Sequence, residues 1–407
     1  MIRDLDIGLD EALELTLSRI RALPTEFVGL PEGVDRVVAE DMRARVDSPS
    51  VDASLKDGYA VRSGDLAGDM TGDSVRLRLA GSVAAGGRED VPVAPGTAVR
   101  VLTGARIPSG ADAVVSEEFA TPEGPDIVFD RPVEPGRNIL PRGSDVSRGR
   151  TVVRGGRRLS PGEVGILAAA GHDRIPVVRN PFAAIVATGD EVVAPGRPLP
   201  EGKVYASNMA TLGSWCRRYG LRTALYHARD DADDLLRTLK NCLDAGADAL
   251  VTSGGAWTGD RDLVARTLDR LGWEKVFHRI RIGPGKAVGF GLLEGKPVFL
   301  LPGGPPSNLM GFLQIALPGL LALGGHLRPS LPEAVVRLDS DLVGRHAHWT
   351  QLVFGDLTPV RGDLPVFRPL RGASRLRSMA EARAVVAIPE GETVLRAGSA
   401  VAAQILD

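Results

Sequence analysis

Between residues 180 and 325, short apolar runs that end in glycine or acidic residues alternate with amphipathic stretches. In the run at 247–262, ADALVTSGGAWTGDRD, a strand pattern ends in Ser253-Gly254-Gly255 and a helical pattern follows it. This alternation predicts a doubly wound α/β domain, in which a parallel sheet carries helices on both faces and binds ligands at the carboxyl ends of its strands. The other expected strands are FAAIVATGDE (182–191), TALYHARDD (223–231) and PVFLLPGGPPS (297–307), and the expected helices are 208–219, 233–243, 263–271 and 308–323.

Outside this region the pattern predicts short strands with few helices. An amphipathic helix is expected at 8–23, and Ser160 followed by Pro161 favours the start of a helix at 161–170. Between 74 and 137, and again after 326, apolar and polar residues alternate between Gly/Pro turns, which predicts β modules, with a barrel or a sandwich at the C-terminal end. The predicted domains are a discontinuous N-terminal domain (1–50 and 138–179), an inserted β module (51–137), the α/β domain (180–326) and a C-terminal β domain (327–407).

Composition narrows the class of protein. The chain has 49 Lys and Arg against 51 Asp and Glu, and this balance argues against a general nucleic-acid binder. Cys216 and Cys242 fall in expected helices, where they are interpreted as core residues in a reducing compartment. We expect a cytoplasmic protein, because no apolar run reaches the ~18 residues of a membrane span and the acidic N-terminus does not resemble a signal peptide.

Acidic residues follow two of the expected strands. Asp190 and Glu191, after Thr188-Gly189, could hold a hydrated Mg²⁺ ion that carries phosphate oxygens, or they could be solvated acids in a capped turn. Asp260 and Asp262 could form a second acidic pair or cap the next helix. Carboxylates alone repel phosphate, so their use at a phosphate site implies a metal ion or a basic partner.

Two glycine-rich turns could receive an anion. Lys286 ends the run RIGPGK, which lacks the spacing of a P-loop but presents one ammonium group, and a solvated loop lysine is the alternative. The loop at 302–307, PGGPPS, precedes a helix whose free amides would attract an anion, although plain turn chemistry also explains it. Asp57 and Asp145 lie in ordinary turns. His346 and His348 are expected on one face of a strand rather than as metal ligands.

Taken in order, these motifs resemble the molybdopterin molybdenumtransferase family, the MoeA type whose eukaryotic counterpart is the gephyrin E domain. The resemblance covers nearly the whole chain. The matching stretches are SLKDGYAVRSGD (54–65), TGARIPSGADAVVSEE (103–118), GRNILPRGSDVSRG (136–149), LSPGEVGILAAAGHDRIPVVRNP (159–181), ATGDEVVAPGRPLPEGKVYASN (187–208), DALVTSGG and GDRD within 248–262, PGKAVGFG (284–291), LPGGPPSN (301–308) and SMAEARAVVAIPEG (378–391).

The resemblance implies an elongated helical and extended domain, an inserted β module, a molybdopterin-binding α/β domain and a C-terminal β-barrel. It implies a homodimer whose active cleft lies between the α/β domain of one subunit and the β module region of the other. The implied enzyme is a transferase of molybdenum cofactor biosynthesis that inserts molybdate into adenylylated molybdopterin and releases AMP with the help of Mg²⁺. Its implied partners are the adenylyltransferase and recipient molybdoenzymes, with no nucleic acid and no membrane.

The family's functional residues carry over by position. The implied catalytic residues are Asp57, Asp145, Glu191, Asp262 and Lys286. The residues implied to bind the cofactor are Thr188, Gly189, Asp190, Ser253, Gly254, Gly255, Arg279, Pro302, Gly303, Pro305 and Ser307. The last four match the loop that the family uses for the oxyanion. The implied metal ligands are Asp190, Glu191, Asp230 and Asp262.

The sequence departs from the family pattern mainly around the α/β pocket. Gly283 stands where the family usually has a lysine before PGK, Gly304 replaces the asparagine of the LPGNPVS motif, and Trp257 replaces a small residue after SGG. Ala287, Pro306 and Lys56 are further departures. They keep open a second hypothesis, a non-catalytic paralogue of the same fold that binds pterin or serves as a scaffold.

Overall fold

The computed structural model describes residues 7–67, 74–87, 91–255, 263–370 and 374–406. Its contacts divide the chain into two compact units: unit 1 is residues 1–26, 35–39 and 177–407, and unit 2 is residues 27–34 and 40–176. The chain passes from one unit to the other in β1 (Thr25–Gly29), after residues 34 and 39, and in β12 (Arg174–Val178). The four predicted domains divide the chain more finely than these units do, and they stay a prediction.

The predicted β module forms a curled six-stranded sheet in unit 2, in the order β7-β4-β6-β5-β9-β8. Strands β5 and β6 are parallel, and the other neighbours are antiparallel. Both faces of β4 are buried, because Tyr59 packs in one core with Phe129 and Ala60 packs in a second core with Val99. The elements are β4 (Gly58–Val61), η2 (Ser63–Leu66), β5 (Val75–Val83), β6 (Thr97–Val101), β7 (Ala113–Ser116), η3 (Glu117–Phe119), β8 (Ala120–Glu123) and β9 (Asp126–Phe129).

The rest of unit 2 consists of short paired strands and one helix. The helix α2 (Pro161–Ala169) confirms the prediction at 161–170. The Ser160 hydroxyl accepts from the Glu163 amide, and the Glu163 carboxylate accepts from the Ser160 amide, so both donors at the helix start are satisfied. The remaining elements are η1 (Pro31–Gly33), β2 (Met42–Arg43), β3 (Ala53–Ser54), β10 (Ile139–Leu140) and β11 (Thr151–Val153).

The α/β sheet of unit 1 has six strands in the order β16-β13-β17-β21-β20-β18. The four strands expected from the sequence run parallel, while β20 is antiparallel to both of its neighbours and was not expected. In register, Ser253 lies opposite Ala187 on one side and Leu301 on the other, so the strand ends meet at one edge. The strands are β13 (Phe182–Thr188), β16 (Arg222–Ala228), β17 (Ala249–Ser253), β18 (Glu274–His278), β20 (Gly289–Leu293) and β21 (Lys296–Leu301), and the pair β14 (Val192–Val193) and β15 (Val204–Tyr205) follows β13.

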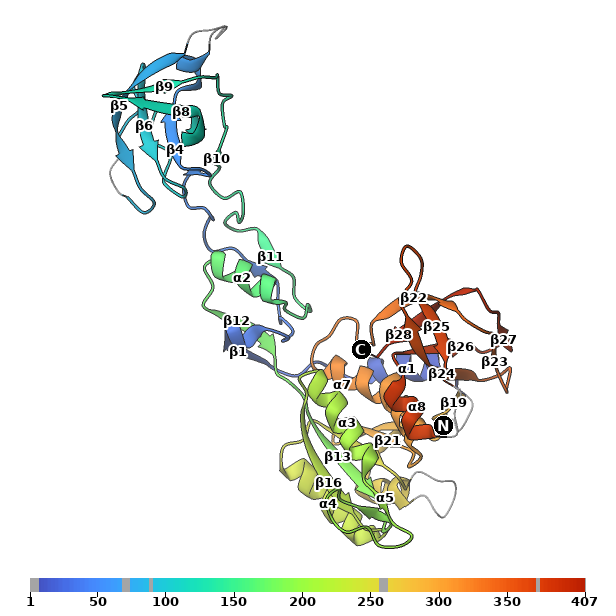
Figure 1. The fold of residues 1–407 in the computed structure, drawn as a ribbon. Coiled ribbons are helices and arrows are strands. Elements are labelled where there is room, and N and C mark those ends of the chain that lie inside the picture. Colours follow the sequence, from blue (N-terminus) through green and yellow to red (C-terminus); the bar gives the residue numbers. More distant parts are fainter. Residues whose placement is uncertain (1–6, 68–73, 88–90, 256–262, 371–373, 407) are drawn as a thin grey trace. The chain divides into compact units, whose positions relative to one another are not determined.

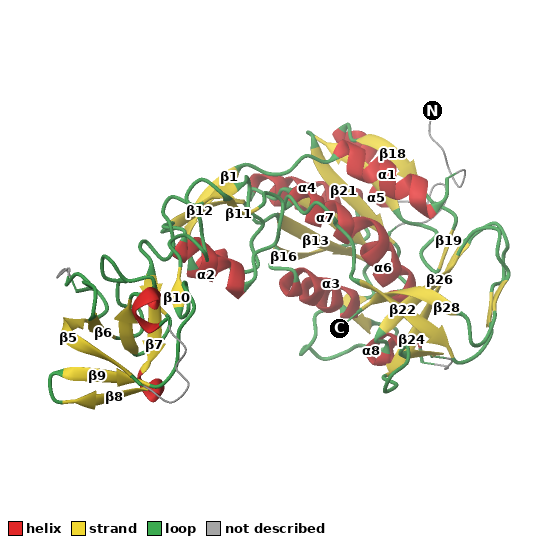
Figure 2. Ribbon diagram, turned by 90° about the horizontal axis from the view of Figure 1, so that it is seen from above, coloured by secondary structure: helices red, strands yellow, loops and turns green. Residues whose placement is uncertain are grey.

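Helices cover both faces of this sheet, which confirms the doubly wound prediction (Figures 1 and 2). Ile185 of β13 packs in one core with Cys216, and Ala184 beside it packs in the other core with Cys242. Burial raises the pKa of both thiols to about 12, in keeping with their interpretation as core residues. The helices are α1 (Leu9–Arg19), α3 (Ser207–Arg218), α4 (Ala232–Asp244), α5 (Leu263–Leu271), α6 (Pro305–Gly311) and α7 (Leu317–Leu323).

Between α6 and α7 the helix continues through a π-helical turn, η5 (Phe312–Ala316), in which the Leu317 amide donates to the Phe312 carbonyl. By length and composition this run could cross a membrane, but 83% of its most apolar window is buried within the protein, as in a core helix. Gln314 of the turn exchanges side-chain hydrogen bonds of 2.7 and 3.3 Å with Gln404 of the C-terminal domain.

The C-terminal strands form a closed barrel, which decides between the barrel and the sandwich left open by the strand pattern. Strands β24, β25, β22, β28 and β26 pair in that order, and β26 pairs back onto β24. Gly355 makes room inside the barrel, since a Cβ there would lie 2.2 Å from the Phe367 ring. The elements are β19 (Ile282–Gly283), which extends the sheet at β24, β22 (Glu333–Leu338), β23 (Leu342–Val343), β24 (Thr350–Thr358), β25 (Val366–Pro369), α8 (Arg375–Glu381), β26 (Ala384–Ile388), β27 (Val394–Leu395) and β28 (Ala400–Ile405).

Candidate functional site

Three strand ends of the α/β sheet pack against one another at the predicted site. Gly254 and Gly255 have φ of +96° and +66°, values that favour glycine. A Cβ on Gly254 would lie 2.7 Å from the Thr188 carbonyl oxygen, and one on Gly255 would lie 2.9 Å from Thr188 Oγ1. A Cβ on Gly303 would lie 3.6 Å from the Gly254 Cα. The turns after β13, β17 and β21 are therefore in close contact, as the sequence predicted.

Thr188 Oγ1 at this junction is buried and makes no hydrogen bond with the residues that the structure describes. Such a hydroxyl is costly to leave unsatisfied, by about 1–3 kcal/mol. A ligand bound at the strand ends could form the hydrogen bond that this hydroxyl lacks.

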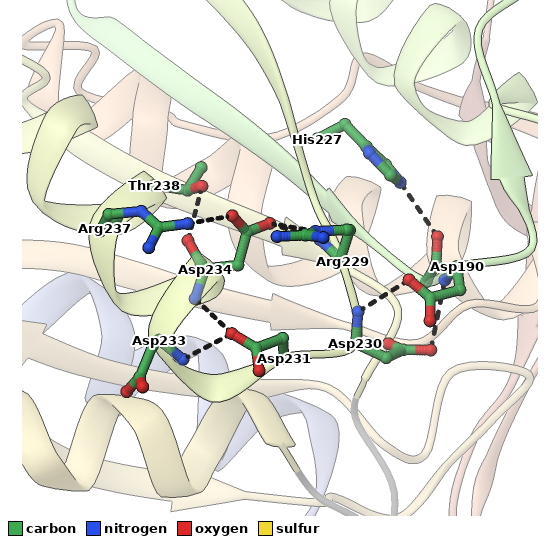
Figure 3. Close-up of polar contacts among 10 residues, drawn as sticks. Asp190, His227, Arg229, Asp230, Asp231, Asp233, Asp234, Arg237 and Thr238 are labelled. Carbon is green, nitrogen blue, oxygen red and sulfur yellow. Dashed lines mark hydrogen bonds and ion pairs between the residues drawn. The ribbon is translucent and has the colours of Figure 1, made fainter.

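Asp190 and Asp230 lie side by side at the ends of β13 and β16 (Figure 3). Each carboxylate accepts a hydrogen bond of 3.3 Å from the backbone amide of the other residue. The His227 ring contacts the Gly189 carbonyl at 3.0 Å. The Glu191 carboxylate folds back over Gly189, where an added Cβ would lie 2.5 Å from it. The structure therefore places three of the four predicted metal ligands at the ends of the neighbouring strands β13 and β16.

The neighbouring acids on α4 have structural tasks instead (Figure 3). Asp231 caps the helix by accepting from the amides of Asp233 and Asp234 at 3.1 and 2.8 Å. Asp234 pairs with Arg237 at 2.6 Å, and a hydrogen bond from the Arg229 amide is the largest factor that lowers its pKa. Asp230 differs from these acids because its carboxylate contacts another predicted metal ligand, Asp190, instead of capping a helix or pairing with an arginine.

The oxygen-only chemistry of the acidic pair fits a hard cation such as Mg²⁺, which binds through one or two carboxylates and keeps several waters. In the described ranges no group of three or more His, Cys, Asp or Glu residues is arranged to hold a metal ion alone. Asp260 and Asp262, the second predicted acidic pair, and Trp257 lie outside the described residues.

Lys286 and Ser307 line a cavity of about 580 Å³ between the α/β domain and the barrel. Arg345, His346 and Trp349 line the same cavity. The expectation for the two histidines was wrong: residues 346–349 form a turn before β24, in which His346 lies 5.4 Å from the Trp349 ring, centroid to centroid. Neither the strand pattern nor a motif pointed to Arg345, which supplies a second cation to the cavity.

Arg279 lies directly after β18, and its neighbour Ile280 donates its amide to the Lys286 carbonyl at 3.0 Å. The Arg279 backbone is in the left-handed region, with φ of +70°, and its amide donates to the Val288 carbonyl at 2.8 Å. Its side chain makes no hydrogen bond with any other predicted site residue in the described part of the chain.

Asp57 and Asp145 belong to unit 2. Asp57 Oδ1 accepts hydrogen bonds of 2.6 Å from the Thr103 amide and 2.8 Å from the Thr103 hydroxyl. These two bonds, the amide first, lower the pKa of Asp57, and Arg100 adds a smaller effect of the same sign. Asp145 is exposed, and its amide donates to the Ser48 carbonyl. Thr103 was not singled out from the sequence, although it begins the quoted motif TGARIPSG.

Comparisons with known proteins cover both units. Residues 7–171 match the family described as the MoeA N-terminal region (domain I and II), and residues 184–322 match a probable molybdopterin binding domain. The chain is 29% identical over 336 residues to a molybdopterin molybdenumtransferase of Staphylococcus aureus, which is 82% of this chain and 80% of the relative. It is 33% identical over 321 residues to the enzyme of the same name from Haemophilus influenzae, which is 78% of each.

The chain belongs to the molybdopterin molybdenumtransferase family.

Solved structures extend the likeness over nearly the full length. Two structures of molybdopterin biosynthesis MoeA proteins from Pyrococcus horikoshii overlay with TM-scores of 0.82 and 0.84, at 33% and 29% identity, over 98% of this chain and 99% of the other. As a member of the molybdopterin molybdenumtransferase family, the chain is a transferase of molybdenum cofactor biosynthesis that binds molybdopterin. The family resemblance and the fold class inferred from the motifs are confirmed.

Proposed function

We propose that this chain inserts molybdate into adenylylated molybdopterin and releases AMP, with Mg²⁺ as its cofactor. The observation that best supports the proposal is the contact between the turns at Thr188, Gly254 and Gly303 beside the acidic pair. Glycine backbones let a phosphate approach closely, and the unpaired Thr188 hydroxyl offers a donor at the same place. In the reaction, water attacks the phosphoanhydride and splits it into AMP and the pterin phosphate. The pterin's two sulfurs replace one oxo ligand of molybdate, which leaves as water with the two thiol protons.

Asp190, Asp230 and Glu191 would hold the Mg²⁺ ion, with Asp262 as the further ligand implied by the family. When bound, the ion would neutralise charge on the phosphoanhydride oxygens as that bond breaks. The reciprocal hydrogen bonds between Asp190 and Asp230 orient both carboxylates before any ligand arrives. Each of these bonds uses one oxygen of a carboxylate, and the second oxygen would be the one that binds the cation.

The cavity that Lys286 shares with Ser307 and Arg345 suits molybdate, a tetrahedral dianion. Two cations and a hydroxyl supply the charge and the hydrogen bonds that such an anion needs. The phosphoanhydride would lie at the strand ends and the oxyanion in this cavity, so that the two substrates bind to different groups.

The remaining parts of the proposal rest on the family resemblance. The enzyme acts as a cytoplasmic homodimer, and Asp57 and Asp145 face the active cleft of the other subunit. Two hydrogen bonds from Thr103 orient the Asp57 carboxylate and lower its pKa, which favours its charged form. An adenylyltransferase supplies the substrate, and molybdoenzymes receive the product.

The test is an anaerobic insertion assay with purified protein, adenylylated molybdopterin, Mg²⁺ and molybdate, following AMP release and activation of an apo-molybdoenzyme. We expect molybdate-dependent AMP release that falls at least tenfold in Asp230→Asn, because one ligand charge is lost. Asp244→Asn, an exposed acid at the end of α4, is the matched control and should retain wild-type turnover. Full turnover in the absence of any divalent cation would refute the Mg²⁺ part of the proposal.

Gly283 favours the second candidate function, a non-catalytic paralogue that binds pterin or serves as a scaffold. This residue lines the cavity with Lys286 at the position where the family usually has another lysine. Tight pterin binding without AMP release in the same assay would favour the paralogue over the enzyme.

A further inference from the structure

Two asparagines surround the hydroxyl of Ser253 at the end of β17. Asn208 Nδ2 lies 3.2 Å from Ser253 Oγ and 2.8 Å from the Gly303 carbonyl oxygen. Asn308 Nδ2 lies 3.0 Å from Ser253 Oγ and 2.9 Å from the Pro302 carbonyl oxygen. One asparagine comes from α3 and the other from α6, and together they join the SGG turn to the loop after β21.

The backbone carbonyls fix which way each amide points. A carbonyl oxygen can only accept a hydrogen bond, so the amide atom that faces Pro302 or Gly303 must be the nitrogen. In both asparagines the same nitrogen also faces Ser253 Oγ. Each NH₂ group therefore donates one hydrogen to a carbonyl and the other to the serine.

This arrangement determines the role of the serine. A hydroxyl oxygen has two lone pairs, and both are taken when it accepts from Asn208 and Asn308. The Ser253 proton must then be donated elsewhere, and it meets no acceptor among the residues that the structure describes. Ser253 is only 5% exposed and lies at the carboxyl end of β17, the edge at which parallel sheets bind their ligands.

We propose that Asn208 and Asn308 are positioning residues that hold Ser253 as a hydrogen-bond donor to an acceptor atom of the phosphorylated pterin. The inference rests on the proposed function, since it assigns a role within that substrate site. If an oxygen replaced either amide nitrogen, the Ser253 hydroxyl would donate its hydrogen bond to that oxygen. The substrate would then lack its hydrogen bond from Ser253.

The test is a double-mutant cycle on Asn208 and Ser253, measured as the Kd of adenylylated molybdopterin and as kcat/KM for AMP release. Asn208 is only partly buried, whereas Asn308 is 1% exposed, so Asn208 can be changed with less risk to folding. Asn208→Asp offers the serine an acceptor, and we expect it to weaken binding about tenfold, as Ser253→Ala should. The double variant should be no weaker than Ser253→Ala alone, because both changes remove the same bond.

A second comparison separates positioning from simple support of the loop. Asn208→Ala removes the bridge to Gly303 but leaves the Ser253 proton free to donate outward, so it should bind the pterin more tightly than Asn208→Asp. Asn241→Asp, on the exposed side of α4, controls for the added charge and should bind as wild type does. Equal losses in Asn208→Ala and Asn208→Asp, or losses that add to that of Ser253→Ala, would overturn the inference. A wild-type protein that neither binds the pterin nor releases AMP would instead overturn the proposed function.

Discussion

Asp248 accepts a forked pair of hydrogen bonds from Arg179, at 2.6 and 2.9 Å, and a third from the Phe182 amide at 2.9 Å. Hydrogen bonding to Asp248 raises the pKa of Arg179. Phe182 begins β13, whose other end carries Thr188. The Arg179–Asp248 pair thus holds the start of β13, the strand that ends at the site residue Thr188.

Replacing Asp248 with asparagine should lower the free energy of unfolding by about 1.5–3 kcal/mol, because the charged, forked pair is lost while Arg179 stays charged. Urea unfolding followed by circular dichroism measures this change. Asp244→Asn nearby, on an exposed acid, should change stability by less than about 0.5 kcal/mol. Equal stability of the two variants would show that the fork contributes nothing.

The hydrogen bond from the Thr103 hydroxyl should be the second-largest cause of the lowered pKa of Asp57; the largest is the hydrogen bond from the Thr103 amide. Thr103→Val removes the hydroxyl and keeps the amide, so the pKa of Asp57 should rise part of the way toward its ordinary value. A carboxyl pKa that is depressed in the folded state adds stability above the unfolded pKa, and this is lost as pH falls through the folded pKa. NMR titration with carboxyl-labelled aspartate measures the shift.

The matched control for that titration is Thr97→Val in the same unit, since the Thr97 hydroxyl donates to the Ala94 carbonyl and touches no carboxylate. It should leave the Asp57 curve unchanged. An Asp57 curve that is the same in Thr103→Val and in the wild type would contradict the assignment of the shift.

Gly189→Ala should distort the turn after β13, which carries Asp190 and Glu191. Gly189 has φ of +135°, and the new Cβ would meet the Glu191 carboxylate at 2.5 Å. We expect a loss of about 1–3 kcal/mol in stability and a weaker response of AMP release to Mg²⁺, because Glu191 must move. Gly196→Ala, with φ of +85° and open space around the Cβ, carries backbone strain without the clash and should keep its Mg²⁺ response.

Lys286→Met should raise the molybdate concentration needed for half-maximal AMP release at least tenfold, because one of the cavity's two cations is removed. The Kd of adenylylated molybdopterin should change little, since the pterin is assigned to the strand ends. Lys240→Met, on the exposed side of α4, is the control. A variant with unchanged molybdate dependence would remove Lys286 from the oxyanion site.

The parallel strands of the α/β domain could be predicted because most of their residues are apolar and Gly, Ser or Asp follows each run. The antiparallel strand β20 could not, because glycines at 289 and 291 interrupt its apolar pattern and it begins at Gly289. The barrel was distinguishable from a sandwich only by the long-range pairing of β24 with β26.

Among the site residues too, those in local motifs could be predicted and those brought in by long-range contacts could not. Ser253 and Gly254 were found because they end a strand in a local motif. Arg345 was missed because it reaches the cavity from a turn about 60 residues after Lys286, and contacts at such separation leave no local signal. Asn208 stood inside a quoted motif, but only its bonds to Ser253 and Gly303 reveal its task.

The π-helical turn at Phe312–Ala316 allows the buried helix to continue past a proline. The ring of Pro318 would clash with the Gln314 carbonyl in a regular α-helix, and the wider turn just before it relieves this conflict. Deleting one residue of the turn would rotate everything beyond it by about 100°. The leucines of α7 would then leave the core, and a deletion ahead of Gln314 would also turn its side chain away from Gln404. One surplus residue thus sets the angular register between the loop at Pro305 and the C-terminal barrel.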